Sequence, residues 1–239
     1  MSTGPQYDYE AIEPGHYDAI YHERKGVRSK WHHLKFERLA RSLGSYERHL
    51  DIGCGPGTFV GSLRGAGHST GVDIAPAQIE YASARYGAPN REFRTVSPEA
   101  LPFRDGAFDL VTMVELVEHL TEEDCLRLMA EVRRVLRPGG RLILTTPNYA
   151  AFWPLLEKLV NRFGTIDYAD QHISKYRRES LRALLVRTGF RVDMVETFLF
   201  TGPFFAALGW GAADWAERCE PAWIRKRLGH LLIARAVRE

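Results

Sequence analysis

The chain has 239 residues, of which 45% are hydrophobic and 26% are charged. This composition is typical of a globular protein and excludes a disordered or fibrous chain. The length suits one large domain, or one domain with an elaborated cap. With 32 Lys and Arg against 30 Asp and Glu, the chain lacks the strongly basic balance of proteins that bind nucleic acid non-specifically.

Cysteine content and the N-terminal residues indicate the cellular compartment. Cys54, Cys125 and Cys219 are scattered along the chain, which favours reduced thiols over a disulfide framework. The first ten residues, MSTGPQYDYE, contain neither a basic start nor an apolar run, so we expect no secretory signal. No segment approaches the ~20 apolar residues of a transmembrane helix. We therefore expect a cytoplasmic protein, whose oligomeric state the sequence does not predict.

The charges are unevenly distributed along the chain. Residues 50–150 contain 10 basic and 13 acidic side chains, whereas residues 151–239 contain 14 basic and 10 acidic ones. An acidic centre followed by a basic C-terminal part indicates that the two parts have different roles.

Hydrophobic periodicity and turn residues predict alternating strands and helices over the first 150 residues. A polar tail over residues 1–15 precedes a helix at about 29–43. A strand then ends at Asp51, and a glycine-rich turn leads into a helix that begins near Thr58 and ends before Gly65. The next predicted elements are a strand at 68–74, a helix at 76–86, strands at 92–96 and 108–114, a helix at 122–136 and a strand at 141–146.

After Pro147 this alternation stops. Residues 151–163 are aromatic and amphipathic, residues 178–188 form the next predicted helix, and two late strands are predicted at 190–198 and 230–237. Strands that alternate with helices at this spacing predict βαβ units, and hence an α/β fold with a parallel sheet.

The turn after the first strand contains Gly53, Gly55 and Gly57, whose missing side chains let the backbone approach a ligand closely. The fingerprint of dinucleotide-binding proteins needs a third Gly or Ala at a fixed spacing, where this chain has Thr58 or Val60. The turn therefore does not match a dinucleotide site.

Two acidic residues accompany the turn. Asp51 lies two residues before the first glycine, where it would repel a pyrophosphate and suit a cationic ligand. Asp73 ends the second strand, where a carboxylate can accept hydrogen bonds from ribose hydroxyls.

Four segments, LDIGCGPGTFV, GVDIAPAQIEYA, EALPFRDGAFDLVTMVE and VLRPGGRLILTTPN, resemble the successive motifs of class I S-adenosylmethionine-dependent methyltransferases over about residues 48–150. The resemblance implies a Rossmann-like, seven-stranded, mostly parallel sheet in the order 3-2-1-4-5-7-6, with helices on both faces. It also implies S-adenosylmethionine as the cofactor. We expect a tail and lid helix over residues 1–44 and a methyltransferase domain over 45–239, with cap insertions at about 150–178 and 200–228.

Matching positions with the family motifs gives the expected cofactor contacts. The glycine turn and Asp51 would surround the methionine part, the end of the second strand would bind the ribose, the segment from Ser97 would face the adenine, and the end of the fourth strand would line the methyl donor. Many relatives have Asp-Ala where this chain has Ser97-Pro98, so Ser97 would supply a weaker adenine contact. The expected cofactor residues are Asp51, Gly53, Gly55, Gly57, Asp73, Ile74, Ser97, Glu99, Ala100, Leu101, Val114 and Glu115.

A candidate metal site follows the strand at 108–114. Glu115, Glu118 and His119 have the spacing i, i+3 and i+4, which would place them on one face if the stretch were helical. Carboxylates and imidazoles suit Mg²⁺, Mn²⁺ or Zn²⁺. The stretch VTMVELVEHL resembles ubiquinone-pathway O-methyltransferases and RNA 2′-O-methyltransferases that hold a divalent ion with such a cluster, and His172 falls where the RNA enzymes supply a further histidine.

The same residues are also compatible with two alternatives to a metal site. Without metal, His119 or His172 would act as a general base. The Glu-His pair also occurs in methyltransferases where it only caps a helix or packs beside the cofactor.

Aromatic residues at both ends of the chain suggest how substrates are enclosed. The N-terminal segment is rich in Tyr and His, and the resemblance to small-molecule methyltransferases, in which such a segment folds over the cofactor, implies a lid. A solvated helix is the alternative. Residues 151–163 and 200–224 are rich in Phe and Trp, which indicates cap packing, a hydrophobic or aromatic substrate pocket, or peripheral membrane contact beside the basic run Arg225, Lys226 and Arg227.

These features lead to one main functional prediction and three alternatives. We expect a methyltransferase that modifies a hydroxyl oxygen of a small molecule, such as a phenol, with or without a divalent metal. The alternatives are an RNA 2′-O-methyltransferase, which the low net charge disfavours, a metal-free N-methyltransferase of an amino sugar or natural product, and a non-catalytic protein that binds S-adenosylmethionine.

Overall fold

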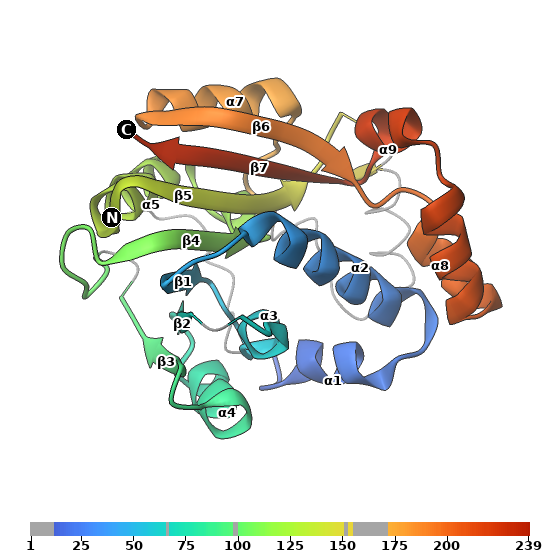
Figure 1. The fold of residues 1–239 in the computed structure, drawn as a ribbon, viewed down its shortest axis with the longest axis horizontal. Helices are drawn as coiled ribbons and strands as arrows, with labels where there is room; N and C mark the ends of the chain where they lie inside the picture. The colour runs from blue at the N-terminus through green and yellow to red at the C-terminus, as the bar shows by residue number, and fades with distance from the viewer. Residues whose placement is uncertain (1–11, 66, 98–99, 151–152, 155–171) are drawn as a thin grey trace.

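The computed structural model describes residues 12–65, 67–97, 100–150, 153–154 and 172–239. A single seven-stranded sheet has the order β3-β2-β1-β4-β5-β7-β6, with helices packed on both sides (Figure 1). The predicted α/β class and strand order are confirmed. The strands are β1 (Arg48–Ile52), β2 (His68–Asp73), β3 (Arg91–Thr95), β4 (Phe108–Val114), β5 (Leu136–Pro147), β6 (Phe190–Phe198) and β7 (Leu231–Arg238).

The first five strands run parallel, whereas β7 is antiparallel to both β5 and β6. Because β1, β2 and β4 are parallel neighbours, their carboxyl ends meet at one edge of the sheet, the usual position of ligands in open α/β folds. The register pairs Asp51 on β1 with Thr112 on β4, and His49 with Ser69 on β2.

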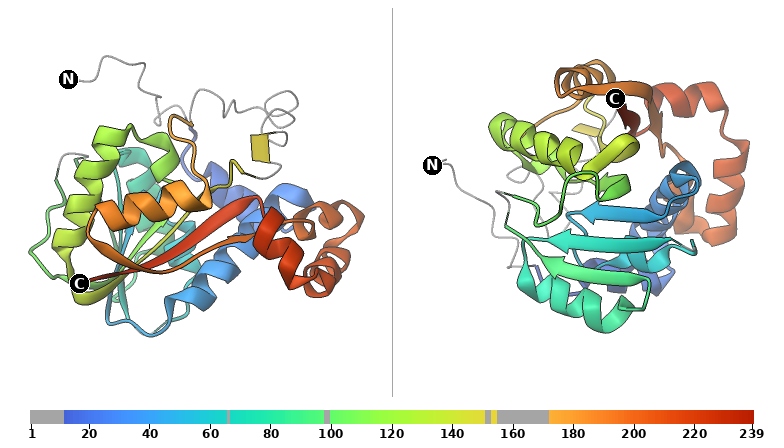
Figure 2. Two further views of the ribbon diagram at one scale, coloured as in Figure 1. Left: turned by 90° about the horizontal axis from the view of Figure 1, so that it is seen from above. Right: turned by 60° about the vertical axis from the view of Figure 1, so that its left-hand side comes forward.

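Helices cover the two faces of the sheet (Figure 2). On one face, α5 and α7 pack Met129 and Leu181 against strand residues such as Leu144. On the opposite face, α2 and α3 pack against residues that include Leu110 and Ile143. The helices are α1 (His16–Glu23), α2 (Gly26–Leu43), α3 (Thr58–Ser62), α4 (Pro76–Tyr86), α5 (Glu122–Val135), α7 (Arg178–Arg187), α8 (Trp210–Cys219), α9 (Ala222–Leu228) and the 3₁₀ helices η2 (Val117–His119) and η3 (Gly202–Leu208).

Some predicted boundaries differ from the structure. The helix expected up to Gly65 ends at Ser62. The strand expected at 141–146 begins earlier, because Leu136 already pairs with Phe108 and a register shift follows before the regular ladder resumes.

The ends of the chain contain helices that the sequence did not predict. Helix α1 lies within the expected lid, and α8 and α9 lie within the expected insertion at 200–228. The amphipathic segment predicted at 151–163 falls outside the described residues, apart from Trp153 and Pro154. Within the described ranges, no helix is both long enough and apolar enough to cross a membrane.

Candidate functional site

The glycine turn connects β1 to α3 at the carboxyl edge of the sheet. Gly53, Gly55 and Gly57 have φ values of +73°, +50° and +75°, in the left-handed region that favours glycine. A Cβ atom at Gly57 would lie 2.7 Å from the ring of Phe93, so this position also requires glycine for packing. At Gly55, by contrast, an added Cβ would meet no atom within 4 Å, which leaves open space over the middle of the turn.

Asp73 at the end of β2 ties this turn to the neighbouring strand. Its carboxylate accepts hydrogen bonds from the backbone N–H of Gly55 at 2.8 Å and of Ala75 at 3.0 Å. The side chain is half-buried and the adjacent Ile74 is 40% exposed. The carboxylate has lone pairs beyond these two bonds, as a ribose-binding residue needs.

Asp51 is held by a buried chain of hydrogen bonds that crosses three strands. Thr112 Oγ1 donates to Asp51 Oδ1 at 2.5 Å, so it must accept from His49 Nε2, which lies 2.7 Å away. His49 Nδ1 then accepts from Ser69 Oγ at 3.2 Å. Tyr46 OH lies 3.3 Å from the same Ser69 oxygen and extends the chain.

Burial in this chain changes two pKa values. Burial, with a smaller contribution from Asp73, raises the pKa of Asp51 to about 7, although the Thr112 hydrogen bond opposes the rise. Burial lowers the pKa of His49 to about 3, so its imidazole is neutral at physiological pH. The protonation of Asp51 is therefore sensitive to pH near neutrality.

The segment expected near the adenine is only partly described. Ser97 and Ala100 are exposed and form an isolated β-bridge, whereas Glu99 lies outside the described residues. Leu101 is buried, and its backbone N–H donates to Glu131 Oε2 at 3.0 Å. The segment is thus exposed at Ser97 and held in place at Leu101 by burial and by the hydrogen bond to Glu131.

The end of β4 corrects the expected helical arrangement of the acidic cluster. Glu115 follows the half-buried Val114 and has a φ of +53°, and η2 begins only at Val117. Glu115 therefore does not share a helix face with Glu118 and His119. Its carboxylate instead forms an ion pair with the buried Lys35 of α2.

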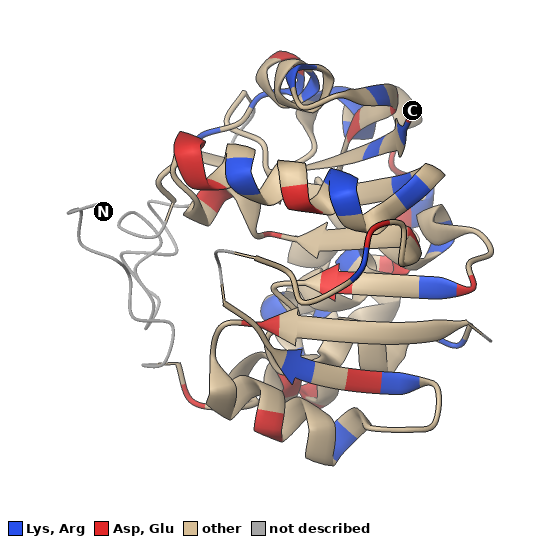
Figure 3. Cartoon of the chain, turned by 90° about the vertical axis from the view of Figure 1, so that its left-hand side faces the viewer, with Lys and Arg blue, Asp and Glu red and all other residues tan. Residues whose placement is uncertain are grey.

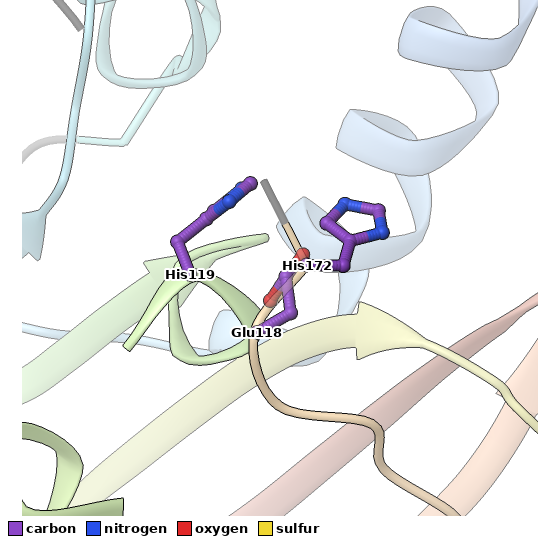
Figure 4. Close-up of side chains that lie close together, drawn as sticks. All are labelled: Glu118, His119 and His172. Carbon is purple, nitrogen blue, oxygen red and sulfur yellow. The ribbon is translucent and has the colours of Figure 1, made fainter. Parts of the chain in front are cut away.

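Glu118, His119 and His172 do come together. One potential ligand atom from each side chain lies within 4.8 Å of the other two. Figure 4 shows the Glu118 carboxylate close to both imidazoles. Glu118 is fully buried: its Oε2 accepts from Thr146 Oγ1 at 3.0 Å, whereas its Oε1 has no hydrogen-bond partner among the described residues.

This arrangement fits a divalent cation. A buried carboxylate oxygen without a partner costs free energy, which a cation would offset. Burial, assisted by the neighbouring Glu115, raises the pKa of Glu118 to about 8, although the Thr146 hydrogen bond and the charge of Lys35 oppose the rise. Tyr149 OH lies 2.9 Å from His172 Nδ1 and orients that imidazole, as partners of metal-binding histidines commonly do.

Several contacts at this site were not expected from the sequence. Lys35, Thr112, Thr146 and Tyr149 each contact one of the predicted acidic or histidine side chains. No motif marks them, because their roles depend on strand register and helix packing. The only available signal was their position at or near the carboxyl ends of strands, or on the expected lid helix.

A family model for a methyltransferase domain matches residues 23–195, which include the glycine turn, Asp73 and the three clustered side chains. The chain belongs to the class I S-adenosylmethionine-dependent methyltransferases. An uncharacterized protein from a Streptomyces fradiae transposon is 34% identical over 148 residues. The matched region covers 60% of the methyltransferase and 39% of the Streptomyces protein. A protein of Mycolicibacterium smegmatis, named a "Probable S-adenosylmethionine-dependent methyltransferase", is 29% identical over 68% of the methyltransferase and 58% of that protein.

The methyltransferase thus spans about half the length of these two relatives. An Aspergillus nomiae protein named as an O-methyltransferase is 32% identical over 65% of the methyltransferase and 72% of that protein. Among solved structures, an S-adenosylmethionine-dependent methyltransferase of Thermotoga maritima aligns with a TM-score of 0.65 at 19% identity, over 93% of the methyltransferase and 95% of that chain. A geranyl diphosphate methyltransferase also aligns with a TM-score of 0.65, at 17% identity, over 94% and 84% of the two chains. These structural similarities support the fold.

Proposed function

We propose that this enzyme methylates a hydroxyl oxygen of a small apolar or aromatic molecule, and that Glu118, His119 and His172 bind a divalent cation. The observation that carries the proposal is the buried Glu118 Oε1, which has no hydrogen-bond partner among the residues that the structure describes and lies beside two imidazoles. One carboxylate and two histidines are ligands that divalent metals commonly use. Glu115 is outside the proposed ligand set, because it pairs with Lys35.

The proposed cofactor site lies at the glycine turn. Open space above Gly55 would admit the methionine part, and the carboxylates of Asp51 and Asp73 suit the cationic and hydroxyl groups of S-adenosylmethionine. Ile74, Ser97 and the residues after it, together with Val114, would complete the site. Helices α1 and α2 would act as the lid proposed for residues 1–44.

The residues around the proposed metal site suit oxygen methylation. A bound Mg²⁺, Mn²⁺ or Zn²⁺ would lower the pKa of a coordinated hydroxyl. Without metal, His119 or His172 would instead act as the general base that takes the proton of the acceptor hydroxyl. The acceptor oxygen then bonds to the methyl carbon while the carbon–sulfur bond breaks, which releases S-adenosylhomocysteine. Alignment of these three atoms is the remaining task of the enzyme.

Aromatic side chains beside His172 support an apolar acceptor. The ring of Trp153 lies 6.1 Å from that of His172 and 5.9 Å from that of Trp31. Phe204 and His230 extend this group, with 5.6 Å between their ring centres. Because ligand pockets are mostly apolar with a few polar anchors, this group of rings beside His172 suits an apolar acceptor.

The distribution of charge disfavours an RNA substrate. Figure 3 shows Lys and Arg interspersed with Asp and Glu along the described helices and strands of one side of the molecule. Several of these charges form local ion pairs, such as Arg127 with Glu123 and Arg134 with Glu131. The names of the Aspergillus relatives also support oxygen methylation of a small molecule.

Metal content and activity of the Glu118→Gln variant test the proposal. We expect the purified wild type to retain close to one divalent ion per chain, measured by mass spectrometry, and to lose methylation of a phenol panel when a chelator is added. Glu118→Gln should lose the metal, whereas the matched control Glu122→Gln, which changes an exposed carboxylate of α5, should retain it.

Two sets of results test the metal site and the cofactor site separately. Chelator-resistant activity together with normal activity of Glu118→Gln would exclude the metal. Failure of S-adenosylhomocysteine to bind in calorimetry, or an affinity unchanged by Asp73→Ala, would contradict the proposed cofactor site.

A further inference from the structure

A separate cavity lies between the lid helices and α3, away from the proposed metal site. Its volume is about 340 Å³. The walls come from helices α1, α2, α3 and α4, the first residue of β3 and the segments that follow α1 and α3; Figure 1 shows α1 beside α3. The lining residues include Tyr21, His22, Arg24, Arg64, Tyr86 and Arg91.

The charge of this cavity is strongly one-sided. Arg24, Arg64 and Arg91 line it, and within the part of the chain that the structure describes no Asp or Glu does. Among the described residues, none of these three arginines has a carboxylate within 4 Å. Three guanidinium groups around one small cavity repel each other, and an anionic ligand would relieve that repulsion.

Two acidic residues lie near the cavity but do not neutralise it. Asp18 is 2% exposed and accepts hydrogen bonds from Thr58 and Tyr81, both at 2.8 Å, and from Tyr86. Its carboxylate also lies 3.7 Å from Arg85 Nε, outside the cavity, and 3.5 Å from His22 Nε2. Glu37, on α2, pairs with Arg41 at 3.3 Å. The charge that faces the cavity therefore stays positive.

The cationic groups are partly held in place before any ligand binds. Arg91 donates to the carbonyl oxygens of Gly61 at 3.3 Å and Leu63 at 2.9 Å, which fixes its guanidinium at the end of α3. Arg24 lies with its guanidinium carbon 5.1 Å from the ring centre of Trp210. A guanidinium has five N–H donors, so Arg91 keeps donors for a ligand.

We propose that this cavity binds a small phosphate ester, with the phosphate on the arginines. Planar guanidinium groups match the paired oxygens of a phosphate. The rings of Tyr21 and Tyr86 line the same cavity and offer apolar surface to the organic part. The volume is at the lower end of the range for small-molecule sites, roughly 300–1,000 Å³.

Occupancy of this site would also stabilise the lid. The cavity spans α1 and α3, and α3 begins at Thr58, directly after the last glycine of the cofactor turn. A ligand that contacts both helices would hold them together. By thermodynamic linkage, it would then bind more tightly when the cofactor is bound, and the cofactor would bind more tightly in its presence.

Calorimetry with defined probes tests the proposal. Inorganic phosphate, glucose 6-phosphate and adenosine monophosphate would be titrated into the protein saturated with S-adenosylhomocysteine, so that the cofactor site is blocked. We expect saturable binding, tighter for at least one ester than for phosphate alone. Arg64→Ala and Arg24→Ala should each weaken it at least tenfold, whereas Arg104→Ala, an exposed arginine outside the cavity, should leave it unchanged.

Three results would overturn the proposal. One is the absence of saturable binding of all three probes at millimolar concentration, while far-ultraviolet circular dichroism confirms that the protein is folded. Another is equal affinity of the Arg64→Ala variant and the wild type. The last is equal affinity for phosphate and both esters, which would restrict the cavity to free phosphate.

Discussion

Replacing Thr112 by valine tests whether the buried chain of hydrogen bonds holds Asp51. Valine has nearly the same shape as threonine but no hydroxyl, so the substitution removes an acceptor from His49 and a donor from Asp51. His49 is 0% exposed and Asp51 is 2% exposed, so water cannot readily replace the lost bonds.

The expected magnitude follows from the number of polar groups left without a partner. A buried donor or acceptor that loses its partner costs about 1–3 kcal/mol, and Thr112→Val leaves two. We therefore expect the free energy of unfolding to fall by about 2–6 kcal/mol. This is a large part of the roughly 5–15 kcal/mol that stabilises a typical domain.

Urea denaturation measures this change, and Thr145→Val is its matched control. Thr145 lies on β5 and is also 0% exposed, but among the described residues its hydroxyl has no hydrogen-bond partner. Strand alternation places it on the same face of the sheet as Thr112, because Ile143 and Leu110, two residues earlier on each strand, both pack against α2 and α3. We expect Thr145→Val to leave the free energy of unfolding unchanged or to raise it.

The difference in unfolding free energy between these two valine variants tests whether the hydrogen bonds of Thr112 stabilise the fold. Equal destabilisation by Thr112→Val and Thr145→Val would refute the reasoning, since the two variants differ in hydrogen bonding and not in burial. Thr112→Val should also raise the pKa of Asp51, because the lost hydrogen bond favours the ionised carboxylate.

Two further predictions concern the cofactor turn and the lid. Because the pKa of Asp51 is raised to about 7 and the ammonium group of S-adenosylhomocysteine prefers the ionised carboxylate, calorimetry should show affinity falling by up to about tenfold per pH unit below pH 7; a flat profile would contradict this role. The stability of the unliganded protein depends on pH in the opposite direction. The folded state holds the proton of Asp51 more tightly than the unfolded chain does, so the contribution of Asp51 to the free energy of unfolding is lost as the pH rises through about 7. Asp18→Asn weakens the bonds that hold α1 to Thr58 and Tyr86, and trypsin should therefore cut faster after Arg24 and Lys25, at the junction of α1 and α2. Unchanged cleavage would show that other contacts hold the lid.

Local sequence signals predicted the central part of the fold well. Pro76 at the start of α4 and the mostly apolar, β-branched-rich segment FDLVTMV of β4 gave the observed boundaries, at 76–86 and 108–114. Here local preference and burial agree. The pattern of motifs added the strand order, which periodicity alone did not determine.

The parts that were not predicted depend on tertiary contacts. Helix α1 has no continuous apolar stripe and is held through the buried Asp18, which contacts residues at least 40 positions away. No sequence pattern predicted the positive φ of Glu115, because non-glycine residues rarely adopt this backbone conformation. The conformation turns the chain so that Glu115 is separated from Glu118 and His119. The structure places His172 beside His119 and Glu118, and the sequence suggested this position only through the family resemblance.

Strand β7 comes after β6 in the chain, yet it lies between β5 and β6 in the sheet. Until residues 231–238 emerge from the ribosome, β5 has an unpaired edge and β6 has no neighbouring strand within the described sheet. Open strand edges promote aggregation during synthesis, and such distant pairing slows folding. Completion of this sheet therefore requires β7, and a nascent chain that stops before Leu231 should aggregate more readily than the full-length chain.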